Sequence, residues 1–164
     1  MTALLPWKAK RDKAAYLSFL PMNHVVEGIL AAYSPYYFPA PVDIYFLEEI
    51  KDLRRALPAV HPAVFFAVPR VYEKIWESFS HSKPGRFYLR AREGVWKRAL
   101  RPLLRRQLLR RAGLDRCAQL IVGSAPPGEF LLRSFHDLGI ELHNAYGLTE
   151  APLISLNRDR KSVV

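Results

Sequence analysis

Thiols and long apolar runs are both scarce in this sequence. Cys117 is the only cysteine among 164 residues, so no disulfide can form within the chain and no zinc cluster can be built on thiolates. We expect this thiol to be buried and unreactive ahead of a strand. The most hydrophobic region, 25–46, is interrupted by Glu27, Asp43 and prolines. No apolar run approaches the roughly 18 residues that a membrane-spanning helix needs.

A secretory leader is also lacking, because charged residues from Lys8 onward replace the apolar core that such a leader requires. We therefore expect a cytoplasmic protein, with peripheral contact to a membrane left open. Hydrophobic residues make up 50% of the chain and charged residues 24%. This balance excludes a disordered chain and favours one domain with a packed core.

Acidic residues are nearly absent from one segment. Between Lys83 and Arg116 there are twelve Lys or Arg and two acids, a net charge of +10, whereas the rest of the chain holds thirteen of each sign. Leucines at helical spacing predict a basic helical insertion at about 83–116, broken or kinked by Pro102. Three interpretations remain open: a solvated helical hairpin, a helix on an anionic membrane surface, and a nucleic-acid-binding segment. The last is unfavoured because it has charge but no recognised binding motif.

Strands and helices are predicted to alternate along the chain. This alternation indicates an α/β fold, with a partly parallel sheet flanked by helices. The helix at 24–33 has Asn23 as its N-cap, and the proline-rich stretch 34–41 should be extended or looped. The strands are expected at 15–20, 43–46, 63–68, 119–122 and 140–143, and the other helices at 47–57 (ended by Pro58), 69–79 and 127–138.

Loops that follow parallel strands gather at one edge of the sheet, where ligands bind in this architecture. We therefore expect the loop at Gly123 and the turn at Tyr146 to form adjacent walls of one cleft. Tyr146 offers a ring for stacking on a purine, Thr149 a donor for a phosphate oxygen, and Glu150 an oxygen ligand for Mg²⁺. Together these groups suggest a nucleotide site.

Two further features could suggest catalysis, but the sequence around them does not favour it. Ser124 follows a strand as a hydrolase nucleophile would, but the surrounding sequence lacks the G-x-S-x-G spacing of a nucleophile elbow. Arg70 begins a helix whose acids should face solvent, while Val71, Ile75 and Phe79 should face inward. The histidines at positions 61, 81, 136 and 143 show no metal-ligand spacing and are given no role.

Four segments in order along the chain resemble the adenylate-forming acyl-CoA synthetase family. They are similar to its L-P-x-x-H segment, to the V-P-R-V-Y-E-K-I stretch of its long-chain fatty acid branch, to its G-[AS]-A-P loop and to its Y-G-x-T-E signature. In this sequence they are Phe19 to His24, Val68 to Ile75, Gly123 to Pro127 and Tyr146 to Glu150.

The resemblance implies a site for ATP and AMP, with Mg²⁺ and coenzyme A as further participants. Adenine and the phosphates would contact residues of the G-[AS]-A-P loop and the signature turn, which are Gly123, Ser124, Ala125, Pro126, Asn144, Ala145, Tyr146, Gly147, Leu148 and Thr149. Thr149 and Glu150 would be catalytic, Glu150 would hold the metal, and His24 would lie near a long-chain fatty acid. The implied fold is part of the family's large N-terminal domain.

Several parts of that family's pattern have no counterpart among these 164 residues. There is no T-S-G-T-T-G-x-P-K type phosphate loop, no ribose-binding Asp motif and no lid domain with a catalytic Lys. We therefore interpret residues 1–158 as a partial AMP-binding domain, inactive alone, and 159–164 as a non-native tail. The alternative is a non-catalytic module that binds a membrane or nucleic acid through 83–116.

Overall fold

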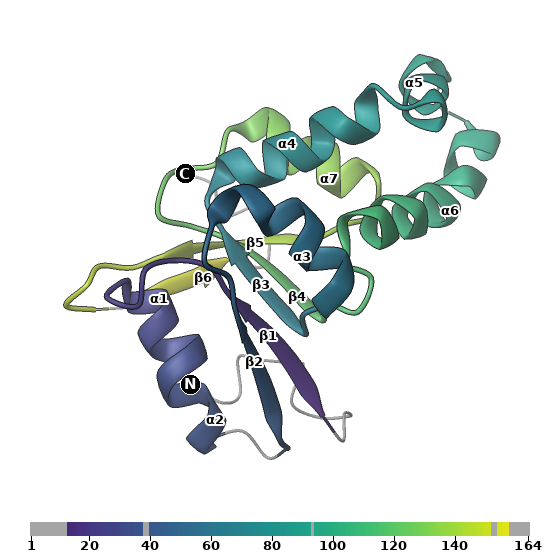
Figure 1. Cartoon of the computed structure of the whole chain (residues 1–164). Coiled ribbons are helices and arrows are strands. Elements are labelled where there is room, and N and C mark those ends of the chain that lie inside the picture. Colours follow the sequence, from purple (N-terminus) through teal and green to yellow (C-terminus); the bar gives the residue numbers. More distant parts are fainter. Residues whose placement is uncertain (1–12, 38–39, 93, 152–153, 158–164) are drawn as a thin grey trace.

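A four-stranded sheet forms the centre of the computed structural model, which describes residues 13–37, 40–92, 94–151 and 154–157. The strand order is β3–β4–β5–β6, with β3, β4 and β5 parallel and β6 antiparallel to β5 (Figure 1). The bounds are Val64–Ala67 for β3, Gln119–Val122 for β4, Leu142–Tyr146 for β5 and Ser155–Asn157 for β6. The predicted partly parallel sheet is thus confirmed.

A second sheet of two parallel strands, β1 (Ala14–Ser18) and β2 (Val42–Phe46), lies against the start of β3. The backbone N–H of Ala63 donates to the carbonyl of Ala15 at 2.8 Å, which joins the two sheets at this point. Both of these N-terminal strands were expected from the sequence.

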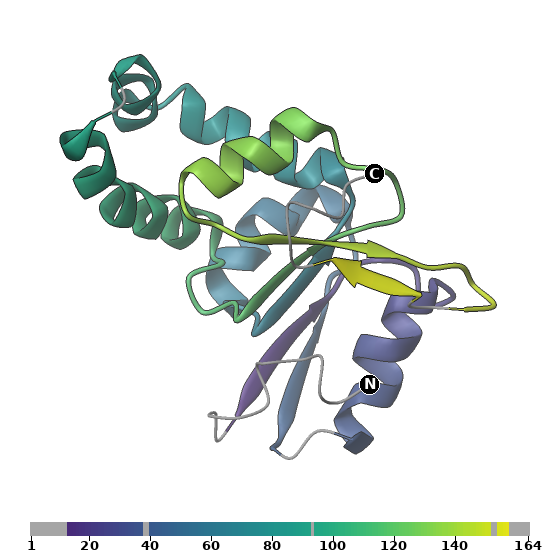
Figure 2. The same cartoon turned by 180° about the vertical axis from the view of Figure 1, so that it is seen from behind.

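Helices cover both faces of the central sheet, as Figures 1 and 2 show. One face packs against α3 (Leu53–Val60), α4 (Pro69–Ser80), α6 (Val95–Ala112) and α7 (Glu129–Asp137) around a large apolar core. The other face packs against β1 and the helical segment formed by α1 (Val25–Glu27), the π-helix η3 (Gly28–Tyr33) and α2 (Ser34–Tyr37). Covering on both faces explains why the four residues of β3 and of β4 are all buried.

The first predicted helix is longer than expected and has a different cap. His24, not Asn23, is the N-cap, and Ser34–Tyr37 is helical although Pro35 was expected to forbid a helix there. A proline ring clashes with the carbonyl four residues earlier in a regular α-helix. The wider turns of η3 lie just ahead of Pro35, and such π-type turns relax that spacing.

The helix predicted at 47–57 exists, but both of its predicted end residues are wrong. A 3₁₀ turn, η4 (Ile50–Asp52), leads into α3, which continues through Pro58 to Val60. Burial of Leu53 and Leu57 against the core holds this helix despite the proline. His61 then ends it in the left-handed conformation, with a φ of 50°.

The basic segment folds as two helices, α5 (Lys83–Arg90) and α6. Of the break or kink expected at Pro102, the break is wrong, because α6 is one helix from Val95 to Ala112. After the proline, Leu104 and Leu108 are buried in the core, and before it Leu100 is partly buried against the same core. This packing stabilises the helix on both sides of Pro102. Gly113 ends α6 in the left-handed conformation, with a φ of 71°.

Candidate functional site

The loop after β4 and the end of β5 lie side by side at one edge of the sheet. The parallel register pairs Val122 with Asn144, so the chain leaves β4 at Gly123 beside Ala145 and Tyr146, the last two residues of β5. Gly123 is buried at this junction, and a Cβ there would lie 2.8 Å from the Phe66 ring and 3.0 Å from the carbonyl oxygen of Ala145. Only glycine fits between these groups. The predicted adjacency of the two loops is confirmed.

His24 reaches the same edge from the N-terminal part of the chain. Its Nε2 atom lies 3.5 Å from the Oγ atom of Ser124, and its ring lies near that of Phe66, with 6.5 Å between centroids. Ser124 has a φ of 64°, a left-handed conformation that is uncommon for a residue with a side chain. The structure thus brings together two residues to which the resemblance gave different roles, His24 near the fatty acid and Ser124 in the loop that contacts adenine.

The tautomer of His24 follows from its cap contact. Its Nδ1 atom accepts a hydrogen bond from the backbone N–H of Val26 at 3.3 Å. In the neutral ring the proton is therefore on Nε2, which can donate to Ser124 but cannot remove its proton. This arrangement argues against a Ser–His hydrolase, in agreement with the sequence analysis.

The signature turn projects from the sheet with its side chains exposed. Tyr146 ends β5, and its side chain is exposed, as are Leu148, Thr149 and Glu150. The N–H of Leu148 donates to the Ala151 carbonyl at 2.9 Å, and the N–H of Ala151 donates back at 3.2 Å. Both views place the connection between β5 and β6 beside the segment that leads into α1 (Figures 1 and 2). Tyr146 and His24 therefore belong to neighbouring loops.

The other predicted site residues are exposed or half-buried. Ala125 and Pro126 are exposed in the loop after β4, while Asn144 and Ala145 are half-buried in β5. Most of the predicted site residues are thus exposed, and a cleft between the two loops stays a prediction. A hollow elsewhere on the molecule lies against α6 and the turn before β5, lined in part by Arg101, Arg105 and Gly139.

Glu150 is suited to share a metal ion with a ligand. No group of three or more His, Cys, Asp or Glu side chains that could hold a metal is found within the described ranges. Mg²⁺ is commonly bound through one or two carboxylates, with substrate phosphates and water completing its shell. An exposed carboxylate on the signature turn fits that donor set.

Glu27 is a buried residue that the sequence analysis noted only as an interruption of an apolar region. Its carboxylate is fully buried and accepts hydrogen bonds from the Tyr16 hydroxyl at 3.0 Å and from the backbone N–H groups of Phe19 and Leu20 at 3.1 and 3.0 Å. Burial, and then the charge of Glu27, raise the pKa of Tyr16 well above its ordinary value. These bonds fix the chain just before His24. An acid within an otherwise apolar helix was the available signal.

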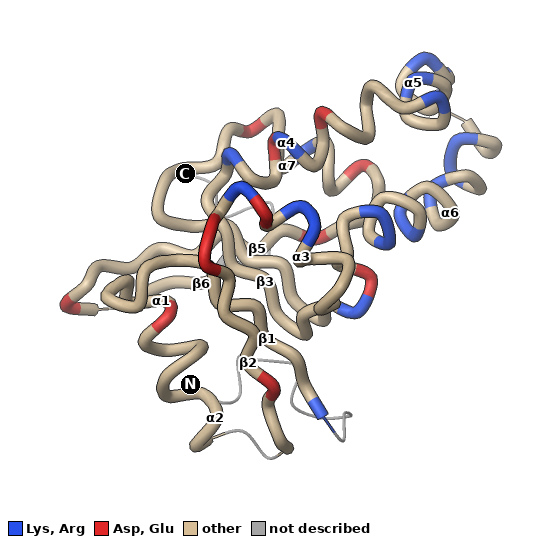
Figure 3. Tube along the Cα trace, viewed as in Figure 1, with Lys and Arg blue, Asp and Glu red and all other residues tan. Residues whose placement is uncertain are grey.

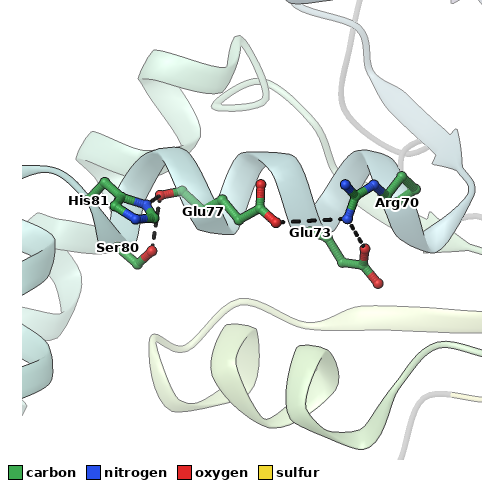
Figure 4. Close-up of polar contacts among 5 residues, drawn as sticks. All are labelled: Arg70, Glu73, Glu77, Ser80 and His81. Carbon is green, nitrogen blue, oxygen red and sulfur yellow. Dashed lines mark hydrogen bonds and ion pairs between the residues drawn. The ribbon is translucent and has the colours of Figure 1, made fainter.

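The Arg70 cluster is structural, as expected. Arg70 contacts Glu73 at 3.0 Å and Glu77 at 3.8 Å along the exposed side of α4 (Figure 4). Of the residues predicted to face inward, Phe79 is buried, and Val71 and Ile75 are partly buried and packed against the core. The prediction omitted Tyr72 and Trp76, which are also buried.

Cys117 and His61 make local contacts outside the site. The Cys117 thiol is half-buried, not fully buried as expected, and donates to the Pro62 carbonyl at 3.0 Å. His61 Nδ1 lies 2.7 Å from a carboxylate oxygen of Asp115, which links the end of α3 to the residues after α6. Neither residue faces the Gly123 loop.

In the part of the chain that the structure describes, no helix is both long and apolar enough to cross a bilayer.

The sequence is similar to curated long-chain fatty acid–CoA ligases. It is 26% identical over 172 residues to the long-chain-fatty-acid–CoA ligase ACSBG2 of Gallus gallus, covering 91% of this chain and 22% of that protein. It is 29% identical over 155 residues to FadD15 of Mycobacterium bovis, covering 82% of this chain and 25% of the relative. The chain therefore spans about a quarter of the length of these relatives.

The fold is similar to solved adenylate-forming enzymes. The adenylation domain of a carboxylate reductase from Mycobacterium chelonae matches with a TM-score of 0.61 at 17% identity, covering 87% of this chain and 22% of that one. A malonyl-CoA ligase with methylmalonyl-CoA and AMP bound matches with a TM-score of 0.57 at 19% identity, covering 96% of this chain and 30% of that one. The family model of the AMP-binding enzymes matches residues 2–163. The chain belongs to the AMP-binding enzyme family.

Proposed function

We propose that this chain is part of an ATP-dependent long-chain fatty acid–CoA ligase, and that it supplies the adenine loop, the signature turn and part of the acyl-binding wall. The observation that supports this most is the convergence of His24, Ser124 and the end of β5 at one edge of the sheet. The names of the similar curated proteins support the long-chain substrate class.

In the first step of this reaction, an oxygen of the fatty acid carboxylate attacks the α-phosphorus of ATP. The bond to the bridging oxygen breaks, pyrophosphate leaves, and an acyl-adenylate forms. The exposed ring of Tyr146 would stack on adenine, and Thr149 would donate to a phosphate oxygen. Glu150 would hold the Mg²⁺ that neutralises phosphate charge. Catalysis of this kind depends on positioning and charge stabilisation and needs no protein nucleophile.

His24 would position the acyl carboxylate. Its neutral ring presents an Nε2–H donor toward the loop after β4, because Nδ1 is occupied by the cap contact with Val26. A donor at this place suits a carboxylate or acyl-phosphate oxygen. In the second step, the thiol of coenzyme A attacks the acyl carbonyl and AMP leaves.

We further propose that these 164 residues catalyse neither step alone, since they contain no phosphate loop of the family type and no lid Lys motif. They should still bind AMP weakly at the Tyr146 edge. Titration calorimetry with AMP tests this. Loss of the stacking partner in Tyr146→Ala should weaken binding by about tenfold, whereas Tyr36→Ala, at an exposed position on α2, should not.

Unchanged AMP affinity in Tyr146→Ala would contradict the adenine site. Formation of a fatty acyl-CoA from ATP by the purified chain would instead contradict only the proposed inactivity, so the two claims can fail separately.

A further inference from the structure

Large apolar side chains are exposed where α5 meets α6. Phe87 is 66% exposed, Val95 80% and Trp96 85%, and Leu89 is also exposed. The junction lies at the far end of these helices from the central sheet in both views (Figures 1 and 2). We call residues 86–92 and 94–98 the hairpin tip. Exposed aromatic and aliphatic groups gathered at a projecting end indicate a surface that contacts a partner.

The same tip is rich in arginine. Arg86, Arg90, Arg92 and Arg98 are all exposed, and Figure 3 shows cationic positions along α5 and α6. Of the two acids in the whole basic segment, Glu93 falls between the two parts of the tip in the sequence and is outside the described residues, whereas Asp115 lies beyond the other end of α6 and contacts His61. Cationic residues thus outnumber acids at the tip. The partner that such a tip fits is therefore anionic and able to accept apolar side chains.

Packing around Tyr88 fixes the tip relative to the fold. Tyr88 is buried, and its hydroxyl donates to the carbonyl of Asp137 at the end of α7, at 3.0 Å. The ammonium of Lys97 lies 4.8 Å from the centre of the Tyr88 ring, and Arg101 Nε donates to the Tyr88 hydroxyl at 3.3 Å. These contacts hold α5 and α6 together, so the exposed groups are presented in one orientation.

The side of α6 is not free to serve as an amphipathic membrane helix. Its leucines at positions 104 and 108 are already buried in the core. Leu103 is exposed on α6 outside the tip, but it is a single side chain and not an apolar stripe along the helix. The larger exposed apolar surface is therefore at the tip. A nucleic acid could stack on the exposed rings of Trp96 and Phe87. The aliphatic side chains of Val95 and Leu89 would stay in water in such a complex, whereas the interface of a bilayer accepts aliphatic and aromatic groups alike.

We propose that the hairpin tip docks on an anionic lipid bilayer. Trp96, Val95 and Phe87 enter the interfacial region, where tryptophan in particular is favoured. The surrounding arginines contact lipid headgroup phosphates. This surface is independent of the proposed nucleotide site, and it would hold the protein beside a source of hydrophobic molecules.

Vesicle sedimentation tests the charged part of the proposal. The full chain should bind vesicles of phosphatidylcholine and phosphatidylglycerol, and binding should weaken as salt rises. Removing two tip charges in Arg90→Gln/Arg98→Gln should weaken binding by about 25-fold. The matched control, Arg54→Gln/Arg55→Gln on exposed positions of α3, lowers the net charge equally and should have a much smaller effect. Equal losses in the two variants would overturn the proposal.

Fluorescence and an apolar control test the insertion. Trp96 emission should shift to shorter wavelength with anionic vesicles, and Trp96→Phe should lose that shift while still binding. Trp96→Ser should weaken binding, whereas Phe130→Ser, at an exposed position on α7, should not. Circular dichroism melting checks that each variant is folded. A tip that stays in water, or tighter binding to an oligonucleotide than to vesicles at equal salt, would overturn membrane docking.

Discussion

The Nε2 atom of His24 lies 3.5 Å from the Oγ atom of Ser124, although 100 residues separate them in the sequence. The contact ties the start of α1 to the loop after β4, next to the end of β5. Because the bond is long and exposed to solvent, it contributes little to stability. Its importance is positional, since it places an N–H donor at the edge where the nucleotide is proposed to bind.

Two substitutions at His24 separate its cap from its loop contact. His24→Ala removes both contacts and should lower the free energy of unfolding by about 1 kcal/mol. His24→Asn keeps a capping oxygen, so its free energy of unfolding should stay within ~0.3 kcal/mol of the parent value. Both lose the reach to Ser124. Urea denaturation measures the difference, and equal stability of the two variants would show that the bond to Val26 does not act as a cap.

Gly123→Ala should push apart the two loops of the candidate site. The added Cβ would lie 2.8 Å from the Phe66 ring and 3.0 Å from the Ala145 carbonyl, so side chain or backbone must move. We expect a loss of about 2 kcal/mol in the free energy of unfolding, together with weaker AMP binding. Gly128→Ala is the control in the same segment, because a Cβ there meets nothing within 4 Å. Chemical denaturation and calorimetry of both variants provide the comparison.

Glu27→Gln should be far more damaging than its conservative size suggests. The Gln amide keeps one acceptor oxygen and replaces the other with an NH₂ group. That NH₂ group then faces at least one of the three donors, which come from Tyr16, Phe19 and Leu20. The expected cost is about 3 kcal/mol, because buried donors lose a charged acceptor. Glu77→Gln, on the exposed face of α4, should change stability by less than about 0.5 kcal/mol. Similar urea midpoints for the two variants would refute a structural role for the buried carboxylate.

Local patterns were sufficient for most of the sheet. The runs at 63–68 and 119–122 correspond to strands whose residues are all buried. Parallel strands covered on both faces are apolar along most of their length and show no alternation with polar residues, so such runs predict them well. The proline positions misled the prediction, since Pro35, Pro58 and Pro102 all lie within helices. Burial of neighbouring leucines outweighed the local cost of Pro58 and Pro102, and the π-type turns of η3 accommodate Pro35. Sequence spacing reports neither effect.

For the candidate site, motif order predicted which loops meet but not what supports them. The adjacency of Gly123 and Tyr146 follows from the rule that parallel strands share a carboxyl edge. The His24 tautomer and the Glu27 bonds depend on contacts with a cap N–H and with residues eight and eleven positions earlier in the chain. Such contacts produce no pattern of residue spacing in the sequence, so they are apparent only in the folded structure.

Alkaline pH should weaken the fold through its buried tyrosines. Burial raises the pKa of Tyr72 well above its ordinary value of 10.0, and burial together with the Glu27 charge does the same for the pKa of Tyr16. In the unfolded chain these hydroxyls lose their protons near pH 10, while in the folded chain they keep them. Stability from each tyrosine is therefore fully present below about pH 10 and is lost as pH rises further.

The expected loss between pH 10 and pH 11 is about 1 kcal/mol for each buried tyrosine. Tyr16→Phe removes one of them, so its unfolding free energy should fall less steeply over this interval than that of the parent, even though it starts lower after losing the bond to Glu27. Tyr36→Phe, at a largely exposed position, should leave the slope unchanged. Urea denaturation at both pH values gives the slopes. Parallel curves for Tyr16→Phe and the parent would contradict this prediction. They would mean that the Tyr16 hydroxyl ionises equally easily in the folded and the unfolded chain, despite its burial against a carboxylate.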